Sequence, residues 1–459
     1  MCRFAILLVA LGGWGCGSPD APGPRVEVIT PAPEPAPEPA PEPAPEPAPE
    51  PTPAPRPYPP EVHSVRLRRS MPVRLAPIEG AKKYGTIAAH TRVGVRSAAR
   101  GPGCESRWIE IEPFGWICEE YLEASTRQPS GVELPRLERG ELVPGAYGKI
   151  GAAGAQTFKL LNGALVPERA LAGSVHVRNY GERQVGDATY WNIGKGEYVA
   201  VKQLRLHDPS EFRGVRLNDD TGLSMPIAFA VDSQRLDRKV VTSKRSVPGR
   251  SAWPVLERGE DAVRIGPGQW LPLRSAVVLD AAAPPDGLLP GERWIDIDLD
   301  RQTLVAYEGE LPVYATLVST GARKYPTETG VYRIWIKFAE TEMNGQMGDE
   351  APYSVATVPW TQFYSKDLAL HTSYWHDGFA TQRSHGCVNL SPLDSRFVYF
   401  WSDPQVPLGW SMAHGTRERP GSIVRVRSAA DPDPPVRGYA QHVLAARAQL
   451  SKPPATVAP

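Results

Sequence analysis

The residue best suited to covalent chemistry is Cys387, which lies in the segment Arg383-Ser384-His385-Gly386-Cys387-Val388-Asn389-Leu390. His371 lies sixteen positions before the cysteine, at the end of an apolar run. A thiol nucleophile needs a base to form the thiolate, N–H donors for an oxyanion, and freedom from disulfide bonding. This segment contains residue types for all three, so we take it as the predicted active site. Spacing alone does not say which histidine is the base.

The first sixteen residues are typical of an export signal. Arg3 is followed by a short apolar run, too short to span a bilayer, and then by small residues up to Cys16. A signal that ends on a cysteine resembles a bacterial lipoprotein signal, which implies that Cys16 is lipid-modified; ordinary secretion is the alternative. Gly17, where aspartate is absent, favours outer-membrane delivery in a cell that has an outer membrane. We expect a periplasmic, cell-envelope protein whose only membrane attachment is this lipid.

The remaining cysteines sharpen the interpretation of Cys387. Cys2 would be removed with the signal. Cys104 and Cys118 lie fourteen positions apart in one β-rich segment, and an oxidising compartment favours a disulfide between them. Cys387 is then left unpaired, and its neighbours favour a reactive thiol over a buried inert one.

Composition limits the possible functions. The chain has 459 residues, which predicts two to four domains. Lysine plus arginine and aspartate plus glutamate both number 51, so no overall charge favours nucleic acid as a partner. Residues 17–60 form a linker that contains a Pro-Ala-Pro-Glu repeat, and alternate prolines favour an extended polyproline II rod of roughly 80 Å. A rod behind a lipid anchor indicates a distant target such as a cell-wall polymer.

Three segments are predicted next: an SH3-like domain over residues 61–126, a second β module over residues 131–216 that is a candidate for the same fold, and a third β module or connector over residues 217–290. The first contains short alternating runs separated by turn residues, and its ending resembles that of bacterial SH3-like domains. This ending and two later stretches that echo it are Gly115-Trp116-Ile117, Gly196-Glu197-Tyr198 and Gly268-Gln269-Trp270. Chance aromatic residues at strand ends are the alternative to a true repeat. The first module has two open roles, wall binding and plain spacer.

The last domain is predicted to be β-rich, which makes the whole chain mainly β. Residues 294–299 alternate as a half-buried strand, residues 303–318 as a hairpin, and residues 332–338 as one further strand. Residues 429–459 are proline-rich and are expected to hang loose, with one helix over residues 439–450.

Residues 291–428 resemble the L,D-transpeptidase catalytic domain of YkuD type. The resemblance rests on the segments Gln302-Thr303-Leu304, Ser319-Thr320-Gly321 and Pro326-Thr327-Glu328-Thr329-Gly330, and on a long signature. The signature is a histidine, twelve intervening residues, then Ser-His-Gly-Cys, a hydrophobic residue and Asn, and His371 and residues 384–389 fill every position. The family often has proline at the position of Glu328, and many members have arginine at that of Asn389.

The resemblance implies roles for the site residues. Cys387 would be the nucleophile and His371 its proton donor and acceptor, oriented by the backbone carbonyl of Thr372. The backbone N–H groups of residues 385–387 would line the oxyanion hole, with His385 and Gly386 among them and Ser384 supporting the geometry. Asn389, Thr372 and Arg383 are the expected substrate-binding residues.

The implied reaction is acyl transfer between peptidoglycan stem peptides through a thioester, which forms 3→3 cross-links without a metal or organic cofactor. Water as the acceptor would make an L,D-carboxypeptidase, and a protein lysine would make a wall-attachment enzyme. A non-enzymatic wall-binding lipoprotein is a further alternative, and so is a zinc site formed by His371, His376, His385 and Cys387. The triplet Asp220-Thr221-Gly222 matches that of aspartic proteases but is interpreted as a turn.

Overall fold

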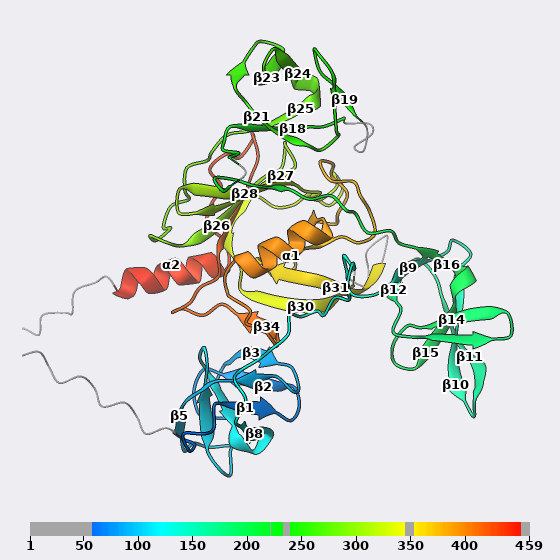
Figure 1. Cartoon of the computed structure of the whole chain (residues 1–459), viewed down its shortest axis with the longest axis vertical. Helices are drawn as coiled ribbons and strands as arrows, with labels where there is room; N and C mark the ends of the chain where they lie inside the picture. The colour runs from blue at the N-terminus through cyan, green and yellow to red at the C-terminus, as the bar shows by residue number, and fades with distance from the viewer. Residues whose placement is uncertain (1–56, 221, 233–238, 345–352, 451–459) are drawn as a thin grey trace, which may run out of the picture. The chain divides into compact units, whose positions relative to one another are not determined.

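The computed structural model describes residues 57–220, 222–232, 239–344 and 353–450. These residues are mainly in strands, which confirms the predicted fold class (Figure 1). The predicted signal, Cys16, most of the linker and Thr221 of the Asp-Thr-Gly triplet lie outside the described residues. Beside Thr221, the Gly222 N–H donates to the carbonyl of Asp219.

The first β module is a set of short strands that enclose one apolar cluster. Cys104 and Cys118 are disulfide-bonded in it, with Cα atoms 5.6 Å apart. Its elements are β1 (Ser64–Leu67), β2 (Met71–Arg74), β3 (Lys83–Ile87), β4 (Arg92–Val93), β5 (Val95–Ala99), β6 (Trp108–Ile111), β7 (Trp116–Cys118), the 3₁₀ helix η1 (Glu119–Tyr121) and β8 (Leu122–Ser125).

The next stretch contains two more groups of strands. The first group is β9 (Tyr147–Ile150), β10 (Ala155–Leu161), β11 (Ala164–Leu171), β12 (Ser174–Arg178), β13 (Glu182–Val185), β14 (Ala188–Asn192), β15 (Glu197–Ala200), η2 (Val201–Gln203) and β16 (Leu204–Leu206). The second group is β17 (Val215–Arg216), β18 (Ile227–Ala230), β19 (Val240–Val241), β20 (Ser246–Val247), β21 (Ala252–Pro254), β22 (Glu257–Arg258), β23 (Ala262–Gly266), β24 (Gln269–Pro272), η3 (Leu273–Ser275) and β25 (Ala276–Leu279).

The three stretches that echo each other in sequence share one local structure. Each is a strand, a 3₁₀ helix of three residues and a second strand: β7-η1-β8, β15-η2-β16 and β24-η3-β25. The glycine before each first strand, Gly115, Gly196 or Gly268, has a positive φ. The repeated sequence pattern therefore corresponds to a repeated backbone conformation.

The C-terminal part contains two sheets with a helix between strands of the second. One sheet has the order β17-β28-β27-β26-β35-β29, and the other contains β31, β30 and β34, with β32 and β33 attached at β31. The elements are β26 (Arg293–Asp298), β27 (Thr303–Glu308), β28 (Leu311–Leu317), β29 (Gly330–Arg333), β30 (Ile336–Asn344), β31 (Tyr353–Phe363), β32 (Ala369–Thr372), β33 (Val388–Leu390), α1 (Pro392–Trp401), β34 (Trp410–His414), β35 (Ile423–Arg427) and α2 (Tyr439–Leu450). The predicted strand and hairpin at residues 294–318 are confirmed.

The single strand predicted over residues 332–338 is wrong. The chain forms β29, which pairs with β35 in one sheet, and then β30, which pairs with β31 and β34 in the other. Ile334 N–H donates to Ser422 and Trp335 N–H to Phe363, so the chain changes sheets between these residues. The alternating pattern continues across the change of sheet because Tyr332, Ile334 and Ile336 are all buried.

Strand β26 is buried on both faces, whereas the sequence pattern predicted one exposed face. Asp296 is 3% exposed and pairs with Arg425 and Arg427 on β35. Trp294, on the same face, packs in a cluster that includes Ile227 and Phe229 of β18. The alternating pattern shows which side chains of β26 are polar. It does not show that the polar face is exposed, and here a neighbouring segment covers that face.

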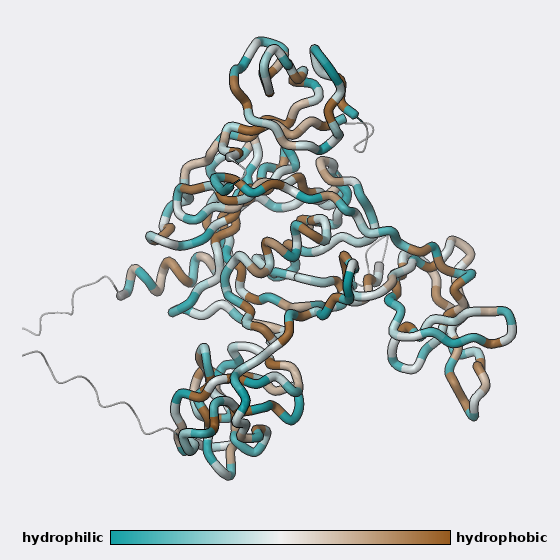
Figure 2. Tube along the Cα trace, viewed as in Figure 1, coloured by the Kyte–Doolittle hydropathy of each residue, from teal (hydrophilic) through white to brown (hydrophobic). Residues whose placement is uncertain are grey.

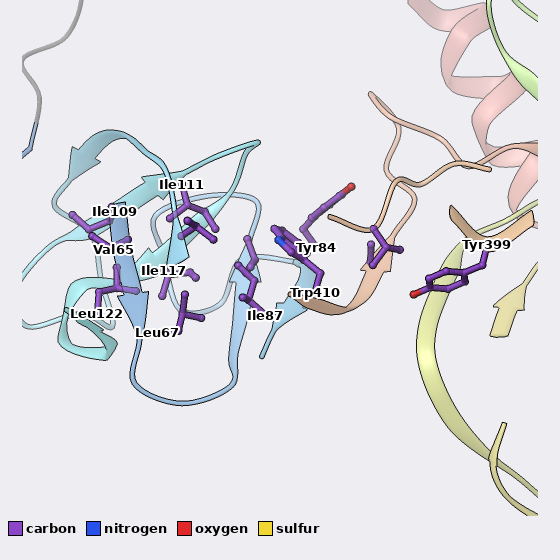
Figure 3. Close-up of a cluster of buried hydrophobic side chains, with 14 of the residues drawn as sticks. Val65, Leu67, Tyr84, Ile87, Ile109, Ile111, Ile117, Leu122, Tyr399 and Trp410 are labelled. Carbon is purple, nitrogen blue, oxygen red and sulfur yellow. The ribbon is translucent and has the colours of Figure 1, made fainter. Parts of the chain in front are cut away.

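The β modules are joined to the C-terminal sheet by strand pairing. β12 pairs in parallel with β31, and β3 pairs antiparallel with β34. Figure 3 shows Tyr84 and Trp410 beside the apolar cluster of the first module. Gly85 lies directly against Trp410, and a Cβ there would approach the indole ring to 2.4 Å, so this pairing needs glycine.

The expectation of a loose tail is wrong for the described residues 429–450, although the predicted helix is present as α2. Ala440 and Val443 are buried, and Figure 2 shows hydrophobic and hydrophilic residues mixed along the helix. Arg447 at its end bonds the carboxylate of Glu292, which Arg333 also bonds. One half-buried carboxylate thus holds the helix against the residue that precedes β26. In the part of the chain that the structure covers, no helix is long and apolar enough to cross a membrane.

We predict that Glu292→Gln lowers stability in a pH-dependent way. Burial raises the pKa of Glu292, but the bonds from Arg447, Arg333 and the Leu289 N–H lower it further, to about 2. A carboxyl whose folded pKa lies below its unfolded value stabilises the fold above the unfolded pKa, and this is lost as pH falls through the folded one. Urea unfolding should show a deficit on the order of 2–3 kcal/mol at pH 7, shrinking between about pH 4.5 and pH 2. The exposed Glu310→Gln is the control, and a deficit independent of pH would contradict the prediction.

Candidate active site

His371 and Cys387 are brought together by the parallel pairing of β32 and β33. Leu370 pairs with Val388 and His371 with Asn389, so Cys387 is at the level of Ala369. Side chains directly opposite each other in a sheet share a face, and each strand alternates faces. His371, Cys387 and Asn389 therefore lie on one face of adjacent strands.

This face opens into a cavity of about 500 Å³. The cavity is lined by most of the residues that the sequence predicted for the site: His371, Arg383, Ser384, His385, Cys387 and Asn389. Thr372 and Gly386 do not line it and act through their backbones instead. Within the described residues, Cys387 is the free cysteine, and it is partly exposed.

His371 is held by the backbone of its neighbour. Its Nδ1 lies 3.0 Å from the carbonyl oxygen of Thr372, the contact that the family resemblance implied. A carbonyl only accepts, so Nδ1 carries the proton and Nε2 is the basic nitrogen of the neutral ring. Burial lowers the pKa of His371 to about 4, against a smaller opposing effect of the Thr372 carbonyl. The ring is therefore neutral at pH 7 and able to accept a proton.

The thiol of Cys387 is protonated in the resting site. Burial raises its pKa to about 11, the Ala369 N–H lowers it in part, and the charge of Asp367 raises it. The Sγ atom lies 3.7 Å from the backbone oxygen of Asp367, which accepts the S–H proton. Thiol and imidazole are therefore both neutral, so the site does not hold a thiolate–imidazolium pair before substrate arrives.

Ser384 closes the loop that carries the cysteine. Its Oγ donates to the Cys387 carbonyl at 2.5 Å and accepts from the Gly386 N–H at 3.1 Å. The Gly386 N–H, which the family resemblance places among the oxyanion-hole donors, bonds Ser384 Oγ in this structure. Gly386 has φ +113°, a conformation that favours glycine, and a Cβ would meet Leu368 at 3.0 Å.

A second support comes from the Pro-Thr-Glu-Thr-Gly segment. Thr327 Oγ1 donates to the Gly386 carbonyl and accepts from the Gly321 N–H, both at 2.8 Å. The neighbouring residue Thr320 accepts from the Ser384 N–H at 3.0 Å. The segments at residues 319–321 and 326–330, which were quoted for the family resemblance, therefore have a physical role: they fix the backbone beside Cys387.

His376 orients Asn389. The Gly378 N–H donates to His376 Nδ1 at 3.1 Å, and His376 Nε2 lies 3.0 Å from the Asn389 amide. Burial, followed by Arg383 and His371, lowers the pKa of His376 to about 4, so the ring is neutral and Nε2 carries its proton. The Asn389 atom at this distance is Nδ2, and two N–H donors cannot bond each other. We therefore assign the amide in the reverse orientation, in which its oxygen accepts from His376 Nε2–H and its NH₂ group points away from His376. Asn389 lines the cavity, where an NH₂ group is a donor for a substrate carbonyl.

Two further predictions from the sequence concern a zinc site and Arg383. Among the residues that the structure covers, the four proposed zinc ligands do not bring three ligand atoms within 4.8 Å of one another. His371 and His376 instead contact Thr372 and Asn389. Arg383 is exposed, and its Nε donates to Thr381 at 3.1 Å while the side chain lines the cavity.

Sequence reasoning missed one wall of the cavity. That wall comes from the segment around β9, β12 and β16 and consists of Lys149, Ser174, His176, Arg205, Leu206, His207 and Asp208. These residues precede His371 by more than 160 positions, and no local motif connects them with Cys387. The local signal is limited to one basic residue inside each of two short strands, Lys149 in β9 and Arg205 in β16.

One family model matches the C-terminal part of the chain. Residues 292–426 match the family model of the L,D-transpeptidase catalytic domain, YkuD. No curated protein matches the chain. Solved structures with similarity include a mutant L,D-transpeptidase of Enterococcus faecium (21% identity, 33% of this chain and 55% of that chain, TM-score 0.25) and an L,D-transpeptidase of Stackebrandtia nassauensis (25%, 32% and 58%, 0.22). An L,D-transpeptidase of Mycobacterium smegmatis shows 17% identity over 49% of this chain and 89% of that one, with a TM-score of 0.25.

The β-rich fold and the family match define the C-terminal part of this chain as a transpeptidase domain. More particularly, residues 292–426 are an L,D-transpeptidase catalytic domain of the YkuD family. The chain covers little more than half the length of the first two solved structures that it resembles.

Thr327→Val is predicted to slow acylation of Cys387 without unfolding the protein. The variant keeps the side-chain shape but leaves the Gly321 N–H and the Gly386 carbonyl without their shared partner. A loop that is displaced by even 1 Å loses rate steeply, and we expect a decrease of about tenfold or more. Thr329→Val is the matched control, because its hydroxyl bonds Asp431 instead. Equal rates in both variants, measured by intact-mass spectrometry, would refute the role of Thr327.

Alkylation of Cys387 by iodoacetamide should rise with pH through the alkaline range. The pKa of about 11 predicts an increase of about tenfold per pH unit from pH 7 to pH 10, with no plateau. In protein that lacks residues 1–56, and with them Cys2 and Cys16, Cys387→Ala should give no labelling, because the two other cysteines, Cys104 and Cys118, are disulfide-bonded. A plateau near neutral pH would instead reveal a thiolate stabilised by His371.

Proposed function

We propose that this chain is a cell-envelope L,D-transpeptidase that forms 3→3 cross-links between peptidoglycan stem peptides through a Cys387 acyl-enzyme. The observation that carries the proposal is the placement of Cys387 and His371 on one face of paired strands, at the wall of one cavity. The domain assignment supplies the reaction class, and the neutral thiol and imidazole indicate how the proton moves.

The first half-reaction transfers an acyl group to sulfur. As Sγ attacks the carbonyl of the third stem residue, its proton passes to His371 Nε2 and a carbon–sulfur bond forms. Because the pKa order opposes proton transfer in the resting site, transfer accompanies the attack and does not precede it. Backbone N–H groups at the cysteine loop and the Asn389 amide are the candidate donors to the oxyanion. Collapse of the intermediate breaks the carbon–nitrogen bond, and the imidazolium gives its proton to the departing D-alanine amine.

The second half-reaction resolves the thioester. An amine of another stem peptide loses a proton to His371 and attacks the thioester carbonyl, and the thiol leaves and regains that proton. The product is an amide cross-link and the starting enzyme. Water in place of the amine gives the L,D-carboxypeptidase alternative, and a protein lysine gives the wall-attachment alternative.

The N-terminal residues support an envelope location for this reaction. The signal-like start, Cys16 and the proline-rich linker are the features of a lipid-anchored protein that reaches a distant polymer. We propose attachment to a membrane through the lipid only, with the outer membrane favoured, and a periplasmic catalytic domain. The SH3-like first module is the part that a purely wall-binding lipoprotein would use.

A carbapenem should acylate Cys387 of protein that lacks residues 1–56, because the strained lactam carbonyl is an activated acyl donor for the thiol. We expect one adduct per chain by intact-mass spectrometry, none in Cys387→Ala, and a rate lowered by about 10²-fold or more in His371→Gln. An unmodified wild-type protein that is folded would refute catalysis by Cys387. Digests of tetrapeptide-rich muropeptides then separate cross-linked dimers from the tripeptides that a carboxypeptidase releases.

A further inference from the structure

We propose that Lys149 and Arg205, from the second β module, form a carboxylate-binding subsite for the donor peptide within the active-site cavity. The inference rests on the proposed acyl transfer and deepens it by assigning the chemistry of the group that the donor must carry. Both residues lie outside the catalytic domain, and both line the same cavity as Cys387.

The two cations are placed side by side by strand register. Lys149 on β9 is directly opposite Arg205 on β16 and directly opposite His176 on β12. Directly opposed residues share a face, so these three side chains form a row across the three strands. His207, two positions after Arg205, lies on that face as well, and His176 Nδ1 contacts its Nε2 at 3.0 Å.

This face is seated against the residues that follow the catalytic histidine. Tyr147 stacks on Tyr374 with ring centroids 4.0 Å apart, and His176 meets the edge of Trp375 at 5.7 Å. Trp375 in turn lies 5.8 Å from the His371 ring. The parallel pairing of β12 with β31 continues the same attachment. Packed aromatic rings and the pairing of β12 with β31 therefore hold Lys149 and Arg205 beside the active-site residues.

Among the residues that the structure describes, no ion pair neutralises the two cations of this row. Arg178 on the same face pairs with Glu340 at 2.8 Å, and Arg169 of the module pairs with Glu197. In the described part of the chain, by contrast, neither Lys149 nor Arg205 makes an ion pair. Asp208 is the acidic residue of the cavity wall, facing three basic ones, Lys149, Arg205 and Arg383.

The two histidines do not add charge. Burial lowers the pKa of His176 to about 3, with further lowering by His207 and Lys149. Burial lowers the pKa of His207 to about 4, and Lys149 and Arg205 lower it further. Each imidazole is thus neutral at pH 7. The positive charge of this wall therefore comes from Lys149 and Arg205.

The ligand that fits is a carboxylate placed near the scissile bond. A Lys or Arg next to a nucleophile binds a carboxylate by charge-assisted hydrogen bonds, and Arg can do so in a bidentate manner. A tetrapeptide stem offers two such sources: the C-terminal carboxylate one residue beyond the scissile carbonyl, and a side-chain carboxylate on the third residue. The shared chemistry is an anionic oxygen pair, and the test separates the two sources.

The experiment measures acylation of Cys387 by synthetic tetrapeptide donors. One donor has both carboxylates, a second has the C-terminus as an amide, and a third has a neutral third side chain. For the wild type, removal of the bound carboxylate should lower the second-order acylation rate by about 10- to 100-fold. Lys149→Met/Arg205→Met should lower the rate for the complete donor by the same factor and leave the donor lacking that carboxylate unchanged. The donor that reacts at the same rate with the wild type and with the double variant is the one that lacks the bound carboxylate, and it thereby identifies that carboxylate.

The control is Arg183→Met/Lys202→Met, which removes two exposed cations of the same module that do not line the cavity. Its ratio of acylation rates for the complete donor and the donor that lacks the bound carboxylate should equal that of the wild type. A lower ratio in Lys149→Met/Arg205→Met is then a local effect and not an effect of total charge. The unchanged rate with the donor that lacks the bound carboxylate shows that the first variant is folded. The subsite would be overturned if the wild type is acylated and Lys149→Met/Arg205→Met still prefers the complete donor by the same factor as the wild type. Absence of any wild-type acylation, by peptide and carbapenem alike, would instead overturn the proposed function.

Discussion

The parallel register between β32 and β33 is the constraint on which the rest of the site depends. A shift of one residue would move either His371 or Cys387 to the opposite face, because side chains alternate along a strand. The register is secured by apolar packing, since Leu370, Val388 and Leu390 are fully buried in one cluster. Cys387 comes just before β33, in a loop that is held by hydrogen bonds from Ser384 and Thr327. Packing thus sets the register, and hydrogen bonds set the loop.

The same burial that secures the register determines how the chemistry starts. Desolvation penalises the charged form of each group, so it raises the pKa of Cys387 and lowers that of His371. The two shifts act in the same sense and disfavour an ion pair in the resting enzyme. A substrate carbonyl that accepts negative charge is then needed for the proton to move. In the proposed reaction, this couples activation of the thiol to the presence of an acyl donor, and it predicts slow oxidation or alkylation of the free thiol at neutral pH.

The β modules are more than spacers in this fold. Pairing of β12 with β31 and of β3 with β34 extends the sheet of the catalytic domain into the segments on either side. The cavity at Cys387 is completed by residues of the second module, among them the cations Lys149 and Arg205. In the proposed function, selection of the donor and the chemical step are divided between two parts of one chain.

The sequence by itself determined the chemical identity of the site and the mainly β character of the fold. Cys387, His371 and the segment between them could be found because their types and spacing are local in sequence, as are the alternating patterns of β26 to β28 and the helix α2. Long-range contacts decided the rest. The covered polar face of β26, the change of sheet at Ile334, the docked tail and the wall with Lys149 and Arg205 depend on segments far apart in the chain. Alternation of apolar residues tells which face of a strand is buried but not what lies against it, and only tertiary packing supplies that partner.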